Sequence, residues 1–272
     1  MKDKMKNNDT ENELLAARVT DQMQKADRGE ISVSEFLTPR EMYFVSSVLN
    51  RAGYRGRFAF CGGYPSAERA RLVCLPEYAL YGTDETDAEA VRQVASELSS
   101  EDTVTLLIRG SGFRSLSHRD FMGALLALGI KRGCLGDILV DGDEAYVFCD
   151  AKMSGFIKDT LTKVGRDSVK VTLGALPDDF AATKRTVTVT DTVASMRADS
   201  VIAALVNCSR EKAKEYVAGG LCELNYEQLL KPDAAVDEGD VLSVRGKGKF
   251  IIKGTDGVTK RGRLRLWAEK YV

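Results

Sequence analysis

The sequence predicts an α+β protein with three domains. These are an N-terminal α/β domain with a flexible start over residues 1–100, a ferredoxin-like βαββαβ domain over 101–178, and a small C-terminal domain over 181–272. The 272 residues suffice for two or three domains of ordinary size. Strand and helix patterns alternate in the middle third, and a polar connection over 177–184 precedes a final segment of different charge.

The N-terminal part is predicted to contain two helices followed by strands. The segment 11–25 is polar with sparse apolar positions, so we expect an exposed helix there. The next helix starts at Thr38, an N-cap residue that Pro39 follows at the first helical position and Glu41 in the first turn. The predicted elements are helices over 11–25 and from 38 to a stop at Gly53, and strands over 58–61 and 71–75.

The middle domain follows the order strand, helix, two strands, helix, strand, which is the order of the ferredoxin-like plait. Asp141 and Gly142 lie between its two central strands and indicate a β-hairpin. Many RNA-binding modules share this topology and stack bases on aromatic residues of the sheet. Tyr146 and Phe148 alternate in the third strand, and we favour their burial because two helices must cover one face. The predicted elements are strands over 104–109, 137–140, 145–149 and 169–173, and helices over 119–128 and 151–164.

The C-terminal segment is basic, whereas the rest of the chain is acidic. From residue 181 onward there are 16 basic and 12 acidic residues, against 23 and 28 before it. In residues 245–272, nine Lys and Arg face only Asp256 and Glu269. Such a distribution favours a polyanionic partner. The predicted elements are strands over 186–189, 221–224, 241–245 and 250–253, and helices over 199–206 and 209–218.

The second of these helices has a basic side. Arg210 and Lys214 lie one turn apart and project from one face, while Ala213 and Val217 can face the core. Beyond it, residues 245–249 alternate cations with glycine, so that backbone amides and ammonium groups can approach phosphates. A solvated basic face is the alternative interpretation.

The same segment resembles the S4 domain, a small RNA-binding fold named for a ribosomal protein. Ala198 stands where that family usually has Leu, and Tyr226 where a small turn residue is usual. The residues that carry the resemblance are Arg197-Ala198-Asp199, Ser209-Arg210-Glu211-Lys212-Ala213, Gly220-Leu221-Cys222-Glu223-Leu224-Asn225, Lys231-Pro232 and Glu238-Gly239-Asp240-Val241-Leu242.

Upstream residues extend the resemblance to the YlmH family of bacteria. They are Phe36 to Glu41, Phe60 to Tyr64, Glu68-Arg69, Leu116 to Gly123, Gly136 to Leu139 and the tail from Arg245 to Arg265. The resemblance implies an N-terminal domain, a ferredoxin-like RNA-binding domain and a C-terminal S4 domain. It also implies binding to large ribosomal subunits that carry a stalled peptidyl-tRNA, a part in ribosome-associated quality control, and a genomic association with cell division.

The resemblance and the charge pattern together give the candidate site. We expect ribosomal RNA and tRNA on the large subunit to be the partners. The candidate RNA-binding residues are Arg197, Ser209, Arg210, Lys212, Lys214, Asn225, Lys231, Arg245, Lys247, Lys249 and, in the middle domain, Arg119.

A kinase is excluded, although His118-Arg119-Asp120 is similar to part of a kinase catalytic loop. That loop requires Asn where this chain has Leu125, and no Gly-rich phosphate loop followed by a strand lysine accompanies it. A helix start capped by Ser117 is the simpler interpretation.

The class of the protein then remains open between two hypotheses. We expect a non-catalytic RNA-binding protein. The alternative is an RNA-modifying enzyme whose active site lies within residues 30–175, around Arg119 and Asp120 or around Asp137. A cleft with a carboxylate of raised pKa would favour the enzyme.

Composition excludes further classes of site. The six cysteines are scattered and His118 is the single imidazole, so we expect neither a metal nor a cofactor. The longest apolar run, residues 121–130, is about half of what a membrane span requires, and residues 1–10 lack the apolar core of a signal peptide. We therefore expect a cytoplasmic protein that is monomeric when free.

Overall fold

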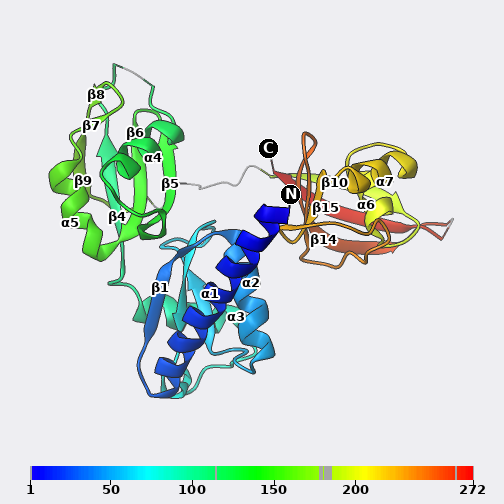
Figure 1. Cartoon of the computed structure of the whole chain (residues 1–272), viewed down its shortest axis with the longest axis horizontal. Coiled ribbons are helices and arrows are strands. Elements are labelled where there is room, and N and C mark those ends of the chain that lie inside the picture. The colour runs from blue at the N-terminus through cyan, green and yellow to red at the C-terminus, as the bar shows by residue number, and fades with distance from the viewer. Residues whose placement is uncertain (1, 114, 178–179, 181–185, 261, 272) are drawn as a thin grey trace. The chain divides into compact units, whose positions relative to one another are not determined.

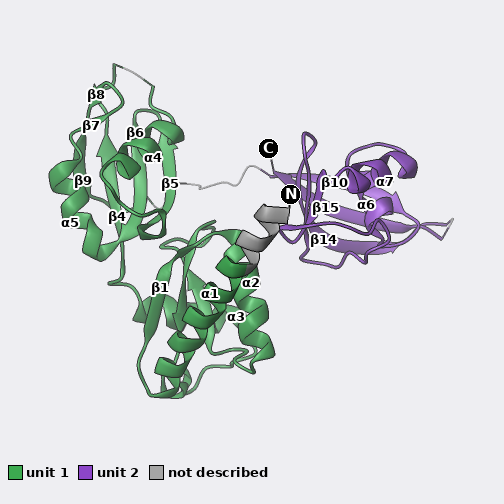
Figure 2. Cartoon of the chain, in the orientation of Figure 1, with its two compact units in different colours: residues 1–182 green, residues 183–272 purple. Residues whose placement is uncertain are grey.

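The computed structural model describes residues 2–113, 115–177, 180, 186–260 and 262–271, with side chains from Thr10 onward. It is a mixed α+β structure whose chain forms two compact units, residues 1–182 and 183–272 (Figures 1 and 2). The polar connection that was predicted over 177–184 lies mostly outside the described residues. The separation of residues 1–100 from 101–178 stays a prediction, and both segments belong to unit 1.

The first part of unit 1 is a three-stranded antiparallel sheet of order β1-β3-β2 with helices packed around it (Figure 1). The predicted cap of the second helix is confirmed, since the Glu41 carboxylate accepts the Thr38 N–H at 2.7 Å. The sequence did not indicate β1 or α3. The elements are α1 Lys2–Asp27, β1 Ser32–Leu37, α2 Pro39–Arg51, β2 Phe58–Cys61, β3 Ala70–Cys74, a 3-10 turn Glu77–Leu80 and α3 Ala88–Leu98.

The first helix is not exposed on all sides, contrary to the prediction. Val19, Met23 and Ala26 are buried and belong to one apolar cluster with Leu49 and Leu72. Their spacing of four and three residues places them on one narrow stripe of α1. The sparse apolar positions of this segment are therefore the ones that anchor it to the sheet.

The second part of unit 1 is a four-stranded antiparallel sheet of order β5-β6-β4-β9. The predicted order of strands and helices is present, and the hairpin turns at Gly142, whose φ is +60°. The last predicted helix is too long, because the chain leaves α5 at Thr160 and enters a small hairpin that turns at Gly165, also with φ +60°. The elements are β4 Thr103–Arg109, α4 His118–Ala127, a 3-10 turn Arg132–Cys134, β5 Leu135–Asp141, β6 Glu144–Asp150, α5 Ala151–Thr160, β7 Lys163–Val164, β8 Asp167–Ser168 and β9 Lys170–Leu173.

Unit 2 is a six-stranded antiparallel sheet of order β10-β15-β14-β13-β11-β12. Its two helices bury their apolar residues with those of one sheet face in a single cluster. The sequence did not indicate β12 or β15, because the last strand alternates Arg and Leu and was interpreted as a basic tail. The elements are β10 Thr186–Val193, α6 Ala198–Leu205, α7 Arg210–Ala218, β11 Cys222–Leu224, β12 Glu227–Gln228, β13 Val241–Val244, β14 Gly248–Val258 and β15 Leu264–Tyr271.

Within the described ranges, no helix combines the length and the apolar character that crossing a lipid bilayer requires. In those same ranges, no three His, Cys, Asp or Glu side chains come together as ligands for a metal ion.

Candidate nucleic-acid interface

A buried carboxylate joins the two helices of unit 2. Asp199, in the first turn of α6, is fully buried. Its Oδ1 accepts a hydrogen bond from Arg197 Nε at 3.3 Å, and its Oδ2 accepts one from Arg210 Nη2 at 2.7 Å. The two arginine side chains remain 45% and 46% exposed. Each guanidinium therefore keeps donors that an anion can reach.

The charge of Asp199 depends on these two partners. Burial alone would raise its pKa, but the hydrogen bonds and positive charges of Arg210 and Arg197 outweigh burial and hold the pKa below its ordinary value. The carboxylate is thus ionised at neutral pH. It keeps two like-charged guanidinium groups side by side, an arrangement that is favourable only with a negative group between them.

The helix α7 is amphipathic in the way that its sequence predicts. Ser209 caps it, because its hydroxyl accepts the Lys212 N–H at 3.1 Å. Ala213 and Val217 are buried on the side toward the sheet, whereas Lys214 is exposed on the side toward solvent. The predicted exposure of Arg210 and Lys214 is confirmed, and Glu211 and Glu215 are exposed on the same helix.

The two lysines of α7 differ in their surroundings. Lys212 Nζ lies 2.8 Å from Glu215 Oε2 and 5.6 Å from the ring centre of Tyr216. The hydrogen bond to Glu215 raises the pKa of Lys212. Lys214 forms no ion pair with any residue that the structure describes. It is therefore the better placed of the two to meet a phosphate.

A backbone carbonyl from the segment after β12 caps the N-terminus of α6. The Pro232 carbonyl accepts the Asp199 N–H at 2.8 Å, which satisfies one of the free amides at the helix N-terminus. Lys231, the residue before it, is exposed. Its backbone position places Lys231 beside the start of the helix that carries Asp199.

The side chains of two predicted RNA-binding residues, Asn225 and Lys249, already make contacts inside unit 2. Asn225 Nδ2 donates to Asp240 Oδ1 at 2.8 Å, and its Oδ1 accepts a backbone N–H of β13. The Lys249 ammonium lies 4.8 Å and 5.0 Å from the ring centres of Tyr226 and Tyr271. The amide of Asn225 serves the turn, and the Lys249 side chain is half-buried between two aromatic rings.

The turn between β13 and β14 presents two further cations. Arg245 and Lys247 are exposed on either side of Gly246, which has a φ of +75° that a tight turn requires. Burial raises the pKa of the Cys208 thiol, and the charges of Lys247 and Lys212 act on that thiol in the opposite direction. Lys247 therefore lies near Cys208, in the connection between α6 and α7.

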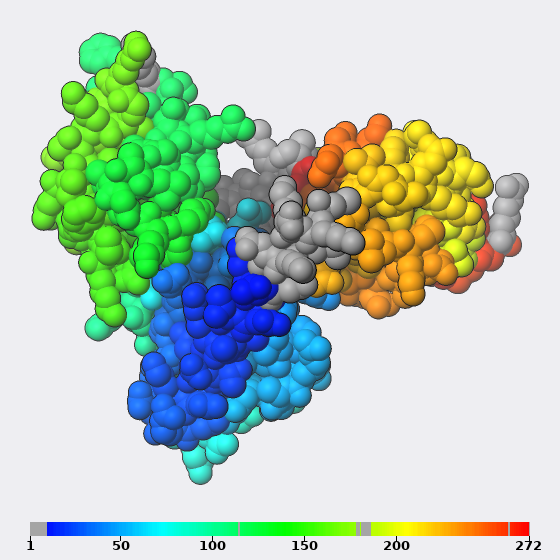
Figure 3. Space-filling model, viewed as in Figure 1, coloured from blue at the N-terminus to red at the C-terminus, as the bar shows by residue number. Residues whose placement is uncertain are grey.

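These positions form one surface around the two helices, which we call the basic helix face. In Figure 3 the helices are the yellow surface of unit 2. Cations on α7, in the residue before α6 and in neighbouring turns can follow a phosphate backbone. The basic helix face consists of Arg197, Arg210, Lys214, Lys231, Arg245 and Lys247.

The sheet of residues 103–173 does not offer its aromatic residues to a ligand. Tyr146 and Phe148 are buried as expected, but the helices are not what covers them. The helices pack against the opposite face of the sheet, where the alternate residues of β6 join their apolar cluster. Phe148 instead stacks on Tyr64 with ring centres 4.9 Å apart, and Tyr146 meets the edge of Phe180 at 5.1 Å.

Hydrogen bonds hold the loop of Tyr64 in place over this face of the sheet. Asp137 accepts from the Tyr64 hydroxyl at 2.6 Å and from the backbone N–H groups of Glu68 and Arg69 at 2.6 and 3.1 Å. The buried Arg69 guanidinium donates to three backbone carbonyls, one of them from β1. Burial and the bond to Asp137 raise the pKa of Tyr64. We call Tyr64, Arg69 and Asp137 the sheet cover.

The start of α4 has the predicted cap. Asp120 accepts from Ser117 N at 2.8 Å and from Ser117 Oγ at 2.6 Å, and these bonds lower its pKa. A general acid requires the opposite shift at neutral pH. Arg119, the remaining candidate RNA-binding residue, is exposed at this helix start in unit 1.

Two features of unit 2 were not singled out from the sequence. Asp199 belongs to the S4-like motif, but its buried contact with Arg210 joins residues eleven positions apart and has no local signal. Trp267 was not singled out either, although it is the one tryptophan of the chain. The alternation of Arg and Leu before Trp267 was the available signal for a strand with one buried face.

Comparisons with known proteins show what this chain is similar to. Residues 104–177 match the family model described as "Putative RNA-binding domain in YlmH", and residues 11–79 match "YlmH, N-terminal". A Bacillus subtilis (strain 168) protein named "Ribosome-associated protein quality control protein P2" is 31% identical over 241 residues, which cover 88% of this chain and 87% of that protein. The solved structure of cell division protein ylmH from Streptococcus pneumoniae has a TM-score of 0.45 and 18% identity, over 61% of this chain and 92% of that one.

The match of residues 104–177 to an RNA-binding domain model supports an RNA-binding role for this α+β protein. The chain belongs to the YlmH family.

Proposed function

We propose that this protein is a non-catalytic RNA-binding factor that docks on the large ribosomal subunit through unit 2, which we infer to be an S4 domain. The name of the Bacillus subtilis relative supports a role in ribosome-associated quality control. In this proposal the protein acts as a monomer in the cytoplasm, on subunits that carry a stalled peptidyl-tRNA.

One observation carries the proposal. Asp199 holds Arg197, the residue before α6, beside Arg210, the first residue of α7, with nearly half of each side chain exposed. Two guanidinium groups fixed in this way match the oxygens of a phosphate better than two freely moving cations, because less side-chain entropy is lost on binding. Lys214 and Lys247 extend the positive charge along the same surface.

The absence of catalysis is also part of the proposal. The carboxylates considered for an enzyme have structural partners: Asp120 caps α4, and Asp137 belongs to the sheet cover. Ribosome binding by a helix face requires neither a cofactor nor a metal ion.

Crosslinking in cells that express a tagged copy, followed by sequencing of the bound RNA, tests the proposed partner. We expect enrichment of one region of large-subunit RNA together with tRNA. Crosslinks that are spread over all cellular RNA in proportion to abundance would contradict docking at a defined ribosomal site.

The variant His118→Gln tests the non-catalytic part. Glutamine preserves much of the hydrogen-bonding capacity of the exposed imidazole, so we expect normal complementation and normal co-sedimentation with large subunits. Removal of a proton-transfer group typically costs about 100-fold in rate. Lost complementation with unchanged binding and thermal stability would overturn the assignment.

A further inference from the structure

The six-stranded sheet of unit 2 has one face packed against helices and one face turned away from them. On β15, Leu266 and Ala268 are buried in the cluster that α6 and α7 share. Side chains two residues apart on a strand point to the same side, so Arg265, Trp267 and Tyr271 lie on the opposite side. We call this the outer sheet face.

Trp267 is the most prominent apolar group on the outer sheet face. It pairs with Gly254 on β14 and with Thr190 on β10, so the two neighbours across the sheet are a residue without a side chain and a small one. The indole is consequently 39% exposed in the middle of a sheet. A large aromatic side chain left open between small neighbours indicates a contact surface rather than a core position.

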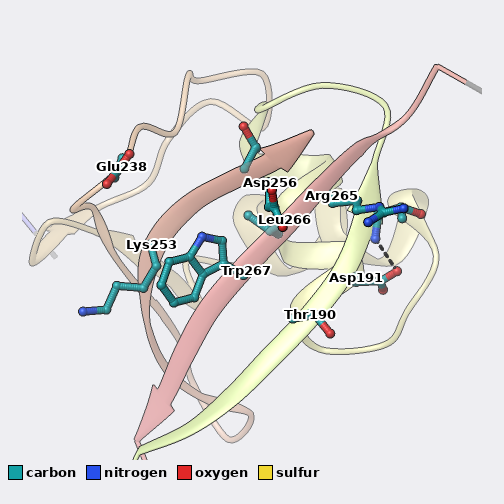
Figure 4. Close-up of a pocket in the computed structure, with 10 residues that line it drawn as sticks. Thr190, Asp191, Glu238, Lys253, Asp256, Arg265, Leu266 and Trp267 are labelled. Atoms are coloured by element: carbon teal, nitrogen blue, oxygen red, sulfur yellow. Dashed lines mark hydrogen bonds between the residues drawn. The ribbon is translucent and has the colours of Figure 1, made fainter. Parts of the chain in front are cut away.

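The surface around Trp267 is hollowed. The hollow has a volume of about 920 Å³ and includes Lys253, Arg265, Thr190 and Thr192. Figure 4 shows the indole in front of the strands, with Lys253 to one side and Arg265 to the other. An aromatic plane with cations at both sides is the arrangement that binds single-stranded nucleic acid, where bases stack and phosphates meet Lys and Arg.

Three carboxylates also line the hollow, and they restrict the ligand. Asp191, Glu238 and Asp256 can accept hydrogen bonds, whereas the threonine hydroxyls can donate or accept them. A bare phosphate would be repelled by the carboxylates. The edge of a nucleobase carries donors as well as acceptors, so it is compatible with such a mixed rim around a stacking plane.

A second aromatic group continues the outer sheet face. Tyr271 lies four residues beyond Trp267, about 13 Å along the strand. Its ring holds the Lys249 ammonium together with Tyr226. Tyr226 has a φ of +66°, a strained conformation for a bulky residue. The fold therefore places aromatic rings and a cation at both ends of this stretch of β15.

The charges beside Trp267 do not select the partner by themselves, because Lys253 and Arg265 share the hollow with three carboxylates. Lys253 also lies 3.4 Å from Glu269 in an ion pair. The arrangement selects it instead: a stacking plane with a cation on either side fits a single strand of RNA, whose bases stack and whose phosphates meet cations.

We propose that the outer sheet face binds an unpaired stretch of RNA, with one nucleobase stacked on Trp267. This surface is separate from the basic helix face, which lies on the side of the helices. The inference rests on the proposed function in one respect, because it takes RNA as the partner.

The single tryptophan makes the test direct, because indole fluorescence of the full chain, excited at a wavelength that tyrosine does not absorb, reports on this site alone. The probes are a short single-stranded RNA of mixed sequence and the fully paired duplex of the same sequence, with binding followed independently by the anisotropy of an end label. We expect single-stranded RNA to quench the indole fluorescence in parallel with binding. Duplex RNA bound to the same level should leave the fluorescence unchanged.

Variants separate stacking from general affinity. Trp267→Ala should weaken single-strand binding by about tenfold or more, whereas Trp267→Phe, which keeps an aromatic plane, should retain much of the affinity. Tyr81→Ala removes another exposed aromatic residue, from unit 1, and should have no effect. Both Trp267 variants should keep the thermal unfolding temperature of the wild type within a few degrees.

Distinct results overturn the inference and the proposed function. Saturating single-strand binding without any fluorescence change, or an unaltered affinity of Trp267→Ala, would overturn the stacking site. If the stacking site were overturned in this way and the double variant Arg210→Ala, Lys214→Ala still lost RNA binding, the proposed function would stand without the stacking site. If the wild-type chain bound neither RNA probe, both the stacking site and the proposed function would be contradicted. If an unlabelled basic protein quenched the indole fluorescence and RNA did not, the outer sheet face would be assigned to a protein partner.

Discussion

The four-stranded sheet of unit 1 and the six-stranded sheet of unit 2 have helices on one face and aromatic side chains on the other. In unit 1, Tyr146 and Phe148 are sealed under Tyr64 and Phe180. In unit 2, Trp267 is open to solvent within its unit. The difference shows that a sheet with helices on one face can have its aromatic face either covered or open. The loops that pack over that face decide which.

The cause of the difference lies in the neighbours of the aromatic residues. Gly63 lies so close to Phe148 that a Cβ on it would be 2.5 Å from the ring, so the loop and the ring fit together without space for another side chain. Asp137 and Arg69 then fix this loop with hydrogen bonds. Trp267 has only Gly254 and Thr190 across the sheet, and neither covers it.

The largest expected effect is on the stability of the sealed sheet. Phe148→Ala should lower the free energy of unfolding by about 3–5 kcal/mol, because it empties a fully buried site. Trp267→Ala is the matched variant on the open sheet and should cost less than half as much. Urea unfolding followed by circular dichroism measures both. Equal losses of unfolding free energy for the two variants would contradict the claim that Phe148 is sealed and Trp267 is open.

A smaller effect is expected at the arginine pair. Asp199→Ala removes the carboxylate that separates Arg197 and Arg210, and should cost roughly 1–3 kcal/mol, less than for a fully buried pair because both arginines are nearly half exposed. RNA affinity should fall as well, since the guanidinium groups lose their fixed positions. Asp199→Asn keeps the shape of the side chain and one hydrogen-bond acceptor, so its stability and its RNA affinity should lie between those of Asp199→Ala and the wild type. A loss of affinity without any loss of stability would contradict the structural role of this carboxylate.

The smallest effect concerns pH. The folded-state pKa of Asp199 lies below the unfolded value of about 3.9, so its contribution to stability is present above about pH 4 and is lost as the pH falls through the lower folded pKa. The stability difference between wild type and Asp199→Asn should therefore be largest near neutral pH and shrink in acid. Urea titrations of both proteins across this range measure it. A difference that grows toward low pH would have the wrong sign.

Local signals in the sequence predicted what depends on near neighbours. The caps at Thr38, Ser117 and Ser209 were identified because each involves residues within one helical turn. The hairpin at Gly142 was identified for the same reason. By contrast, β15 pairs with the preceding strand β14 and with β10, which is about 70 residues away in the sequence, and its alternation of Arg and Leu was interpreted as a charged tail.

The candidate site shows the same division. The cations of the basic helix face were predicted from charge and family resemblance, and the structure places them around α6 and α7. The role of Asp199 was not predicted, because its bond to Arg210 exists only once the helices pack. The sheet cover was missed because Tyr64 and Asp137 are 73 residues apart and no periodic pattern connects them. Such contacts depend on tertiary structure, which propensity and spacing do not encode.

The central claim is that the basic helix face binds ribosomal RNA. Co-sedimentation of the full chain with large ribosomal subunits, at increasing salt, tests it most directly when the wild type is compared with Arg210→Ala together with Lys214→Ala. Lys25→Ala together with Arg28→Ala removes the same charges from exposed positions of unit 1 and is the matched control. The two lost phosphate contacts should weaken binding and reduce the slope of log affinity against log salt by roughly 1.5. Binding and salt dependence equal to those of the wild type and the control would contradict the claim.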